Sequence, residues 1–578
     1  MRKTIADLLI ESLLQAGVKR VYGIVGDSLN AVLDSIRKSK KIEWISVRHE
    51  EVAAFAAGSD ALLSGSIAVC AGSSGPGNLH LINGLYDCHR SRIPVLAIAA
   101  HIPSVEIGGE YFQQTNPEQL FKECSHYCET VTRPEHMPRL ATIAMQHAIS
   151  RKGVSVLVLP GDIAALEDKE SIPEQVIHVT TPVIRPSKLE LERLADYLNE
   201  DKKITLLCGA GCEGAHSLLM QLCEKLKSPM VIALRGKEHL EYDNPYNAGL
   251  TGLIGYSSGY HAIMDADILL MLGTDFPYRQ FYPKDAIILQ VDIRAEHLGR
   301  RAMVTYGLCG DVSETIQSLL PLLKGDRDSE HLNKYVSAYE NVRRDLDSFA
   351  VGKPGRKPIH PQYLTKVISD LADEEAIFTC DVGTPTLWSA RYLRMNGKRR
   401  LLGSFNHGTM ANALPQAIGA QIAKSSNQVI ALCGDGGLSM LMGDLLTLHQ
   451  HNLPVKVIVF NNSALSFVEL EMKAAGYLET GTSLSNPNFA NVAQAMGIEG
   501  IRVEDPAELQ SALQRAFEHN GPFLVDVVVN RQELAMPPKV SLEQAHGFTL
   551  WTLKAVLNGH ADDVIDLAKT NLLDRFHL

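Results

Sequence analysis

Short and almost purely apolar runs recur along this chain, and they constrain its fold more than any other feature. The runs are SIAVCAG, PVLAIAAH, VSVLVLPG, ITLLCGAG, MVIAL, ILLMLG, AIILQVD, AIFTCD, QVIALCGDG, VKVIVFNN and FLVDVVV. Segments with helical spacing separate them. Continuous apolar strands that alternate with helices are typical of parallel sheets covered by helices on both faces. The sequence therefore predicts an α/β fold built on parallel sheets.

Two proline-rich connectors interrupt this alternation, at Thr180–Lys188 and Val351–Gln362, and a third break at Met536–Val540 precedes a short tail. Connectors of this composition are typical of domain boundaries. We expect three doubly wound parallel-sheet domains at residues 1–180, 181–350 and 351–530, and a helical tail at 531–578. In such sheets, ligands bind beyond the carboxyl ends of the strands.

The composition excludes several classes of function. The net charge of −11 argues against nucleic acid as a partner, because phosphate binding needs a basic face. Ten cysteines in 578 residues do not make a disulfide framework. The CxxxC pairs Cys124/Cys128 and Cys208/Cys212 lack the second ligand pair of a zinc site, so we interpret them as reduced core thiols.

The N-terminal segment does not have the pattern of a signal peptide. Asp7 and Glu11 interrupt its apolar face at helical spacing, and no cleavage-type small-residue site follows. No apolar run in the sequence reaches the ~18–20 residues that span a bilayer. We expect a protein that is cytosolic or that lies on a membrane without crossing it.

The stretch CGDGGLSMLMGD places Asp435 between glycines where an apolar strand ends. Asp-Gly-Gly alone is a common turn. Here, however, Asn461 and Asn462 follow the next strand, and two neighbouring strand ends can bring Asp435 and Asn462 together. A carboxylate and an amide oxygen suit Mg²⁺ or Ca²⁺. The glycines would admit a diphosphate, and the following helix would present its N-terminal N–H groups to that anion. We therefore favour a metal–diphosphate site over a plain turn.

The first domain carries two further motifs, HEEVAAFAAG from His49 and GSSGPGN from Gly72. Acids at a helix start usually complement the helix dipole. The small residues Ala53, Ala54 and Ala57 follow at helical spacing, so this helix could pack tightly or admit a flat ligand. The glycine-rich loop after a strand suits either a ligand or a close domain contact.

These three motifs, in this order, resemble those of the thiamine-diphosphate enzymes of the pyruvate oxidase and acetolactate synthase superfamily. The stretches NLHLINGL, ALRGKEH, EYDNPY, FTCDVGTPT and FNNSALSFVELEMKAAGY are most similar to its quinone-linked members, the bacterial pyruvate:ubiquinone oxidoreductases. The resemblance covers essentially the whole chain. It implies a pyrimidine-binding first domain, an FAD-binding second domain and a diphosphate-binding third domain. It also implies an active site between two subunits, hence at least a dimer, with a homotetramer usual for the group.

The resemblance also implies which residues bind thiamine diphosphate. Glu50 matches the carboxylate that faces the aminopyrimidine ring and favours its imino tautomer, and Glu51 is its rival by adjacency. Asp435, Asn462 and the carbonyl of Ala464 match the Mg²⁺ ligands. The other implied contacts are Gly408, Thr409, Met410, Gly436, Gly437, Ser463, Leu465, Ser466, Phe467 and Val468. Met410 would keep the cofactor bent; its alternative is a core methionine.

The middle domain contains Gly209-x-Gly211-x-x-Gly214 after a strand, which alone would indicate a Rossmann dinucleotide site. The next strand ends in Leu234-Arg235 instead of the acid expected at a ribose. The resemblance implies an FAD site instead, with Arg235 at the diphosphate and Asp292 at a ribose hydroxyl or, alternatively, as a helix N-cap. The other implied FAD contacts are Thr251, Gly252, Leu253, Ile254, Thr274, Asp275, Phe276, Pro277 and Tyr278.

Four residues are implied on the substrate side. Phe112 and Gln113 match the position where a related pyruvate oxidase contacts substrate. Phe467 and Glu471 follow the metal-binding asparagine, and Phe467 matches a residue that aids electron passage to FAD. A small aromatic pocket suits the methyl group of pyruvate, although Phe467 could equally belong to the core.

The tail separates the redox enzymes from the carboligases. Val564, Ile565, Ala568, Leu572 and Phe576 fall near one helical face. The resemblance implies an amphipathic membrane anchor close to a membrane-borne electron acceptor. Its acids Asp562, Asp563, Asp566 and Asp574 outnumber its bases, so apolar insertion would dominate over attraction to anionic lipid. The alternative is a helix docked on the protein body.

Together these features lead us to expect a cytoplasmic flavoprotein that is peripheral on the inner face of the cell membrane. It would oxidatively decarboxylate pyruvate to acetate and CO₂ with thiamine diphosphate and Mg²⁺, and pass electrons through FAD to ubiquinone. The alternatives are an acetolactate-forming carboligase with structural FAD, and a pyruvate oxidase that uses phosphate and oxygen. A non-catalytic scaffold is disfavoured by the intact set of Glu50, Asp435 and Asn462.

Overall fold

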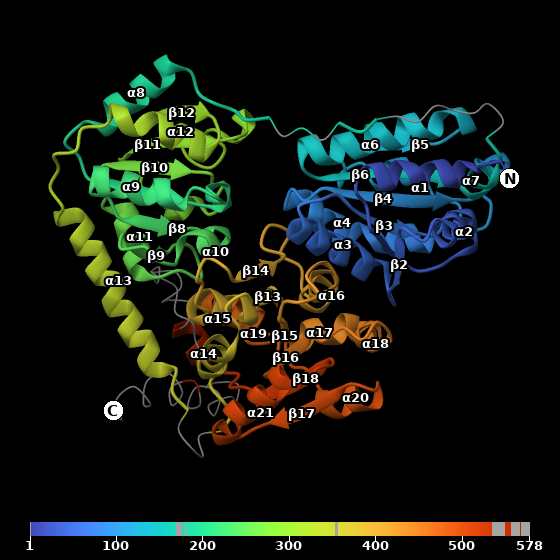
Figure 1. Cartoon of the computed structure of the whole chain (residues 1–578). Helices are drawn as coiled ribbons and strands as arrows, with labels where there is room; N and C mark the ends of the chain where they lie inside the picture. The colour runs from blue at the N-terminus through green and yellow to red at the C-terminus, as the bar shows by residue number, and fades with distance from the viewer. Residues whose placement is uncertain are drawn as a thin grey trace.

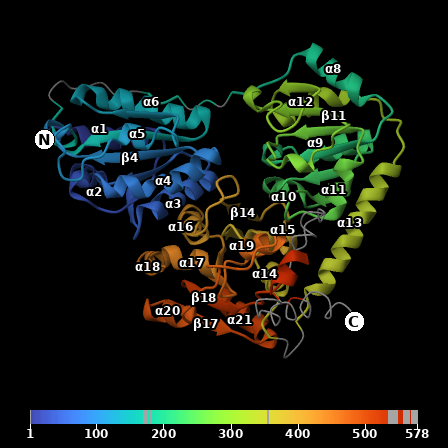
Figure 2. The same cartoon turned by 180° about the vertical axis from the view of Figure 1, so that it is seen from behind.

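A computed structural model describes residues 2–168, 176–178, 180, 182–352, 357–533, 549–555 and 567. It contains three parallel sheets of six strands, which follow one another along the chain. Figure 1 shows the three resulting domains in blue, green and orange, and Figure 2 shows them from behind. The predicted α/β fold with three doubly wound parallel-sheet domains is confirmed. No described helix is long and apolar enough to cross a lipid bilayer.

The first sheet has the strand order β2-β1-β3-β4-β6-β5. Its strands are β1 (Arg20–Gly23), β2 (Glu43–Ser46), β3 (Ala68–Gly72), β4 (Val95–His101), β5 (Tyr127–Thr130) and β6 (Val154–Pro160). Its helices are α1 (Ile5–Gln15), α2 (Asn30–Ser39), α3 (Glu50–Ser64), α4 (Pro76–Arg90), α5 (Pro117–Leu120), α6 (Met137–Arg151) and α7 (Gly161–Ala165). The inner strands β3, β4 and β6 are buried along their whole length, as their continuous apolar sequences predict.

The third sheet has the order β14-β13-β15-β16-β18-β17, which repeats the connectivity of the first. Its strands are β13 (Ile377–Cys380), β14 (Arg400–Gly403), β15 (Val429–Gly434), β16 (Lys456–Asn461), β17 (Glu499–Val503) and β18 (Phe523–Val528). Its helices are α14 (Pro361–Leu371), α15 (Thr384–Tyr392), α16 (Ala413–Ala423), α17 (Asp435–Leu441), α18 (Leu445–Gln450), α19 (Ser466–Ala474), α20 (Phe489–Ala495) and α21 (Pro506–Glu518).

The middle sheet is wound differently, in the order β12-β11-β10-β7-β8-β9. Its strands are β7 (Ile204–Cys208), β8 (Met230–Ile232), β9 (Asn247–Leu250), β10 (Ile268–Leu272), β11 (Ile287–Asp292) and β12 (Tyr306–Cys309). Its helices are α8 (Lys188–Leu198), α9 (His216–Leu226), α10 (Lys237–Leu240), α11 (Ser257–Met264), α12 (Val312–Leu319) and α13 (Glu330–Phe349). This is the strand order of dinucleotide-binding domains.

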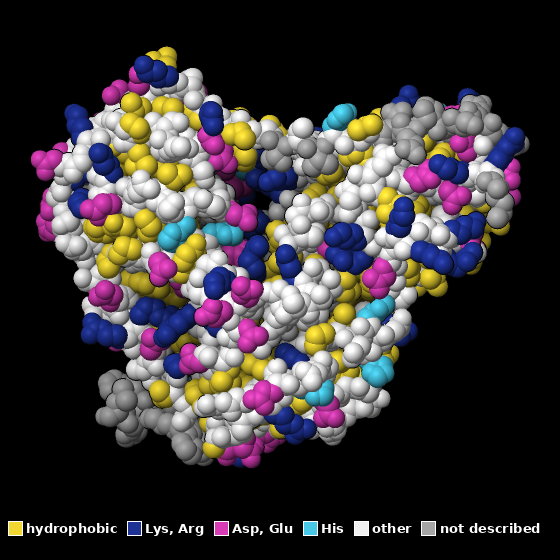
Figure 3. All heavy atoms as spheres, viewed as in Figure 1, with side chains coloured by type: hydrophobic (Ala, Val, Ile, Leu, Met, Phe, Trp, Pro, Cys, Tyr) yellow, Lys and Arg dark blue, Asp and Glu magenta, His cyan; other side chains and the backbone are white. Residues whose placement is uncertain are grey.

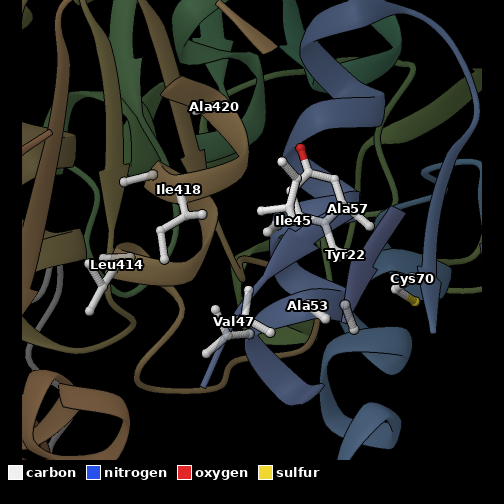
Figure 4. Close-up of a cluster of buried hydrophobic side chains, with 14 of the residues drawn as sticks. Tyr22, Ile45, Val47, Ala53, Ala57, Cys70, Leu414, Ile418 and Ala420 are labelled. Carbon is white, nitrogen blue, oxygen red and sulfur yellow. The ribbon is translucent and has the colours of Figure 1, made fainter. Parts of the chain in front are cut away.

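The first and third domains pack against each other through α3 and α16. Ala53 and Ala57 of α3 belong to the same buried hydrophobic cluster as Leu414 and Ile418 of α16 (Figure 4). The approach is so close that a Cβ at Gly419 would overlap the carbonyl group of Ala56. The alanine-rich stretch after His49 therefore serves tight helix packing between two domains.

Each sheet has one point where its winding reverses, and ligands bind beyond the strand ends at such points. The reversal lies between β1 and β3, between β7 and β10, and between β13 and β15. The loops at these three points begin at Gly72, at Gly209 and Gly273, and at Asp381 and Gly434. Most of the predicted site residues lie in or beside these loops.

Candidate active site

Asp435 lies at the reversal point of the third sheet, as the first residue of α17. Its Oδ1 accepts the N–H of Gly436 at 2.8 Å, and its Oδ2 accepts those of Ser463 at 2.6 Å and Asn462 at 3.1 Å. The strand ends β15 and β16 thus bring Asp435 and Asn462 together, as their spacing predicts. Burial raises the pKa of Asp435, and these hydrogen bonds oppose that shift.

The oxygen atoms in this loop fit a magnesium ion. The Oδ1 of Asn462 accepts the N–H of Ala464 at 3.1 Å, so Asn462 and Ala464 lie in one tight turn, and Asp435 reaches that turn from the neighbouring loop through the N–H groups of Asn462 and Ser463. Carboxylate, amide and peptide oxygens are the hard donors that Mg²⁺ prefers. A bound cation would also favour the charged form of the buried Asp435 carboxyl.

Asn486 is a neighbour of this site that sequence reasoning did not identify. Its Nδ2 donates to Asp435 Oδ2 at 2.8 Å and to Asn461 Oδ1 at 3.0 Å. The loop before it covers the metal-site loop, because Leu465 N–H donates to Thr482 O and Leu484 N–H donates to Ser463 O. The only sequence signal was the asparagine-rich stretch SNPN, which alone is typical of any turn.

The glycines of GDGG are needed for close packing at this site. A Cβ at Gly436 would lie 2.8 Å from Leu465 Cδ2 and 3.4 Å from the methyl carbon of Met410. A Cβ at Gly437 would overlap the carboxylate of Asp381. The structure therefore places Met410 beside the GDGG loop. Gly408 adopts a left-handed backbone with φ of 83°.

Asp381 follows β13 at the same reversal point and was not predicted as a site residue. Its Oδ1 accepts the N–H of Ala413 at 2.9 Å, and its Oδ2 accepts the N–H of Gly434 at 3.0 Å. Burial raises the pKa of Asp381 to about 7, although backbone N–H groups of Ala413, Gly434, Asn412 and Ala411 oppose the shift. The sequence signal was a single aspartate after a buried strand.

Glu50 is the first residue of α3 and is buried, with 6% of its surface exposed. Its Oε2 lies 2.9 Å from Nδ1 of His80, a residue that sequence reasoning missed. The imidazole of His80 stacks on that of His49, with ring centroids 4.4 Å apart. A Cβ at Gly77 would lie 3.1 Å from Glu50 Oε1. Glu50 therefore lies close against the loop GSSGPGN, at a position where only glycine leaves its carboxylate undisturbed.

Glu51, the rival of Glu50, is already committed to a contact between domains. Its Oε1 accepts Nδ2 of Asn83 at 2.7 Å, and the same Nδ2 donates to Thr409 Oγ1 at 3.1 Å. The Oδ1 of Asn83 lies 2.8 Å from Nε2 of His407. This network ties the loop that carries Thr409 to α3 and α4, and leaves Glu50 as the carboxylate with unused acceptor capacity.

Gln113 lies against the loop GSSGPGN, whereas Phe112 projects into solvent. The Oε1 of Gln113 accepts Ser74 Oγ–H at 3.0 Å, and its backbone has a left-handed φ of 61°. The side chain of Phe112 is 79% exposed. An exposed phenylalanine beside a strained residue marks a loop that presents its tip outward.

Two loops at the carboxyl end of the middle sheet, after β8 and β9, carry polar groups without partners among the described residues. Arg235 has no hydrogen-bond or ion-pair partner among the described residues, and burial lowers its pKa. In the same described part of the chain, the hydroxyl of Thr251 is buried without a partner. Arg92 of the first domain, also missed by sequence reasoning, has its pKa lowered to about 10 by burial and by Arg294. Figure 3 shows a hollow between these two domains with Lys and Arg side chains at its floor. These groups fit an anionic dinucleotide such as FAD.

Several other residues predicted to contact FAD pack against one another or against the hydrophobic core. A Cβ at Gly252 would lie 2.9 Å from the ring of Phe276, which packs edge-on against Tyr278. Leu253 and Ile254 pack against the hydrophobic core. Thr274 is buried, and Pro277 follows Phe276 in the same loop.

Two predicted carboxylates of this domain have different partners, an arginine side chain for Asp275 and a backbone N–H for Asp292. Asp275 accepts Nε of Arg301 at 2.9 Å. Asp292 Oδ1 accepts the backbone N–H of Arg294 at 2.9 Å. This bond caps a turn and resembles the helix N-cap that was its alternative role.

Phe467, Val468 and Glu471 lie on α19, directly after the metal-site loop. Ser466 begins this helix. Phe467 is half-buried, whereas Glu471 is exposed. Residues 549–555 are helical and dock beside this element: Trp551 is fully buried and its Nε1–H donates to Glu479 Oε2 at 3.0 Å.

The docked segment meets α19 through charges. Lys473 of α19 lies 5.0 Å from the centre of the Trp551 ring, and its Nζ also pairs with Glu479 at 3.0 Å. The predicted apolar tail face, Val564 to Phe576, lies outside the described residues.

Comparisons with known proteins agree with this geometry. Three family profiles match: "Thiamine pyrophosphate enzyme, N-terminal TPP binding domain" over residues 3–120, its central domain over 191–319, and its C-terminal TPP binding domain over 381–527. The chain belongs to the thiamine pyrophosphate (thiamine diphosphate) enzymes and binds that cofactor.

Individual relatives show which enzymes of this family the chain is similar to. An uncharacterized 42.6 kDa protein of Pseudomonas amyloderamosa is 57% identical over 344 residues, which cover 59% of this chain and 87% of the relative. The putative thiamine pyrophosphate-containing protein YdaP of Bacillus subtilis is 35% identical over 98% of this chain and 99% of its own. Pyruvate oxidase of Lactiplantibacillus plantarum is 28% identical over 92% and 89%. Acetolactate synthase large subunits match at a similar identity. The chain is thus an enzyme of this family with pyruvate oxidase among its relatives.

Proposed function

We propose that this protein oxidatively decarboxylates pyruvate to acetate and CO₂, and delivers the electrons through FAD to ubiquinone at the membrane. Thiamine diphosphate, when bound, supplies the electron sink for decarboxylation of a 2-oxo acid, and FAD supplies the redox step. The observations that carry the proposal are the partnerless hydroxyl of Thr251 and the guanidinium of Arg235, which has no hydrogen-bond or ion-pair partner among the described residues; they follow the carboxyl ends of β9 and β8 in the middle sheet. A positive charge and an orphan hydroxyl at that position suit the phosphates and hydroxyls of a dinucleotide.

The residues of this chain would divide the work as follows. Glu50 would hold a proton opposite the pyrimidine ring, since its carboxylate is buried and keeps acceptor capacity. Asp435, Asn462 and Ala464 would hold Mg²⁺. Phe467 would shield the reacting carbon from water, and Gln113 and Glu471 would contact the substrate carboxylate or its product. Phe112, at an exposed loop tip, would complete a neighbouring subunit.

The active site would form between two subunits. Within one chain, Thr409 of the third domain contacts Asn83, which also bonds Glu51. Glu50 instead lies within hydrogen-bond distance of His80 of its own domain. A second copy would bring its diphosphate domain to Glu50. Mixing Glu50→Gln with Asp435→Ala protein under subunit exchange should restore part of the activity that each lacks, because a mixed dimer has one intact site. Absence of any restoration would argue for a site within one chain.

The C-terminal tail would anchor the enzyme on lipid at the inner face of the cell membrane. The docking of Trp551 beside α19 supports a link between the tail and the helix that carries Phe467. A protein truncated before Ala561 should still reduce a soluble dye with pyruvate, and its rate should no longer rise with phospholipid vesicles. A truncated enzyme with an undiminished lipid response would overturn the anchor.

One experiment distinguishes this function from its alternatives. The FAD-loaded enzyme is mixed anaerobically with thiamine diphosphate, Mg²⁺ and pyruvate, and flavin absorbance is followed. Rapid bleaching with formation of acetate supports the proposal. A flavin that stays oxidised while acetolactate accumulates would identify a carboligase. A strict need for phosphate, with formation of acetyl phosphate and peroxide in air, would identify the phosphate-dependent oxidase.

A further inference from the structure

We propose that Asp381 is a positioning residue that holds the Met410–Ala411 turn against the Gly434–Gly437 loop and so shapes the cofactor seat. The proposal rests on the thiamine diphosphate site and is independent of which 2-oxo acid is the substrate. The hydrogen bonds of Asp381 run to backbone N–H groups on both sides of the cofactor seat, those of Ala413 and Gly434, so it acts through the backbone.

The carboxylate of Asp381 joins two segments that are distant in sequence. One oxygen accepts the N–H of Ala413, at the start of α16, at 2.9 Å. The other accepts the N–H of Gly434, at the end of β15, at 3.0 Å. The side chain is 2% exposed, so water does not replace these bonds when one is lost. The carboxylate therefore fixes the spacing between the Met410 loop and the GDGG loop.

The turn that Asp381 holds is strained. Ala411 has φ of 65°, a left-handed backbone that residues with a Cβ seldom adopt. Such strain persists only where surrounding contacts over-determine the conformation. Here the neighbouring Asn412 donates from Nδ2 to Cys380 O at 2.9 Å, and Asp381 binds the N–H of the next residue. Release of the carboxylate would let Ala411 relax and would carry Met410 with it.

The glycines on the opposite side fit the same account. A side chain at Gly437 would overlap the Asp381 carboxylate, and one at Gly436 would approach Met410 at 3.4 Å. Gly437 thus leaves the space that the Asp381 carboxylate occupies, and Gly436 faces Met410. Asp381 and the two glycines together set how far the Met410 methyl group stands from the diphosphate loop.

The test is a double-mutant cycle between Asp381→Asn and Ala411→Gly. The amide of Asp381→Asn is isosteric but presents NH₂ to a backbone donor, so we expect the Kd for thiamine diphosphate, measured by fluorescence titration at fixed Mg²⁺, to rise about tenfold or more. Glycine adopts positive φ freely. Ala411→Gly should therefore leave the wild-type Kd nearly unchanged and should restore most of the affinity in the Asp381→Asn background.

A role limited to fold stability gives a different pattern. In that case Asp381→Asn would lower the Tm of the cofactor-free protein, with no rescue of affinity by Ala411→Gly. Asp60→Asn is the matched control, because Asp60 is equally a buried carboxylate but bonds Arg20 and Tyr22 in the first domain. It should lower the Tm, leave the Kd unchanged and show no coupling to Ala411→Gly.

If Asp381→Asn does not fold, Asp381→Ser carries the same test, because its smaller side chain cannot accept both N–H groups and presents no NH₂ to them. An unchanged Kd in Asp381→Asn, or a double variant no better than the single one, overturns the proposal. Failure of the wild-type protein to bind thiamine diphosphate would instead overturn the site assignment itself.

Discussion

The first and third domains share one strand connectivity, yet the loops at their reversal points carry different chemistry. In the first, the carboxylate of Glu50 has a single imidazole partner, His80, and lies close against Gly77. In the third, Asp435 accepts three backbone N–H groups and one amide, and Asp381 accepts two further N–H groups. The same sheet thus provides a lone carboxylate in one domain and a densely bonded anion loop in the other.

The difference teaches that the fold supplies a place and the loop residues supply the function. A carboxylate with free lone pairs can exchange a proton with a ring nitrogen. The Asp435 carboxylate is fixed in place by its donors, three of them on Oδ2, and its Oδ1, with a single hydrogen bond, keeps a lone pair for a cation. The following predictions test whether the two domains divide their roles in this way.

The largest effect is expected at the lone carboxylate. Glu50→Gln should lower kcat about 10³-fold or more, within the range for loss of an acid–base group, while FAD absorbance of the purified protein stays unchanged. Glu51→Gln is the matched control and should cost far less, because Glu51 bonds Asn83. Steady-state kinetics with a soluble dye measures both. Equal losses in the two variants would contradict the assignment.

The next largest effect is expected at Asp435, the carboxylate of the third domain. Asp435→Ala should raise the Kd for thiamine diphosphate on the order of 10²-fold at fixed Mg²⁺, with partial recovery at high Mg²⁺. Asn486→Ala removes one hydrogen bond to Asp435 and should raise it about tenfold. Fluorescence titration of the cofactor-free protein measures both. A Kd that Asn486→Ala raises more than Asp435→Ala does would reverse the proposed order of roles.

The junction between the two domains should respond to pH. Asp87 of α4 accepts Ser404 Oγ–H at 2.8 Å across the interface, and burial raises its pKa to about 6 from 3.8. The folded state therefore holds this proton more tightly than the unfolded chain. The stability that the protonated carboxyl contributes is full below pH 3.8 and is lost as pH rises through about 6.

Asp87→Asn removes this titration. The Tm of wild type relative to Asp87→Asn should therefore fall between pH 4 and pH 7, by the equivalent of about 3 kcal/mol at most. Thermal melts of both proteins across that range measure the difference. A difference in Tm that is constant with pH would show that Asp87 keeps an ordinary pKa in the folded protein.

The smallest effect is expected where the two domains touch by packing alone. A methyl group in Gly419→Ala would overlap Ala56 of α3, and overpacking of this kind costs about 1–3 kcal/mol. We expect a Tm lower by several degrees. Gly443→Ala is the control, because a Cβ there meets no atom within 4 Å. Equal melting temperatures for the two variants would mean that α3 and α16 separate easily.

The strands show where prediction from sequence succeeded and where it stopped. The predicted runs became the inner strands, such as β4 and β16, which are buried along their whole length. The strands that escaped prediction include β2, β5, β9, β12, β14 and β17, which form the edges of the sheets. Edge strands such as β2 (EWIS) are partly exposed, so their sequences mix polar and apolar residues and lack the signal of double-sided burial.

The sequence by itself determined the fold class, the cofactor family and the pairing of Asp435 with Asn462. The fold class and the pairing of Asp435 with Asn462 follow from local order: an apolar run, a glycine, and a ligand residue at the strand end. The cofactor family follows from the resemblance that the motifs carry. The resemblance selected Glu50 over Glu51, and only the tertiary structure showed that Glu51 bonds Asn83. It alone brought in Asp381, His80, Asn486 and Arg92, whose partners lie on other strands or in other domains. A residue that acts through a distant backbone leaves no spacing pattern, so its role appears only when the chain is folded.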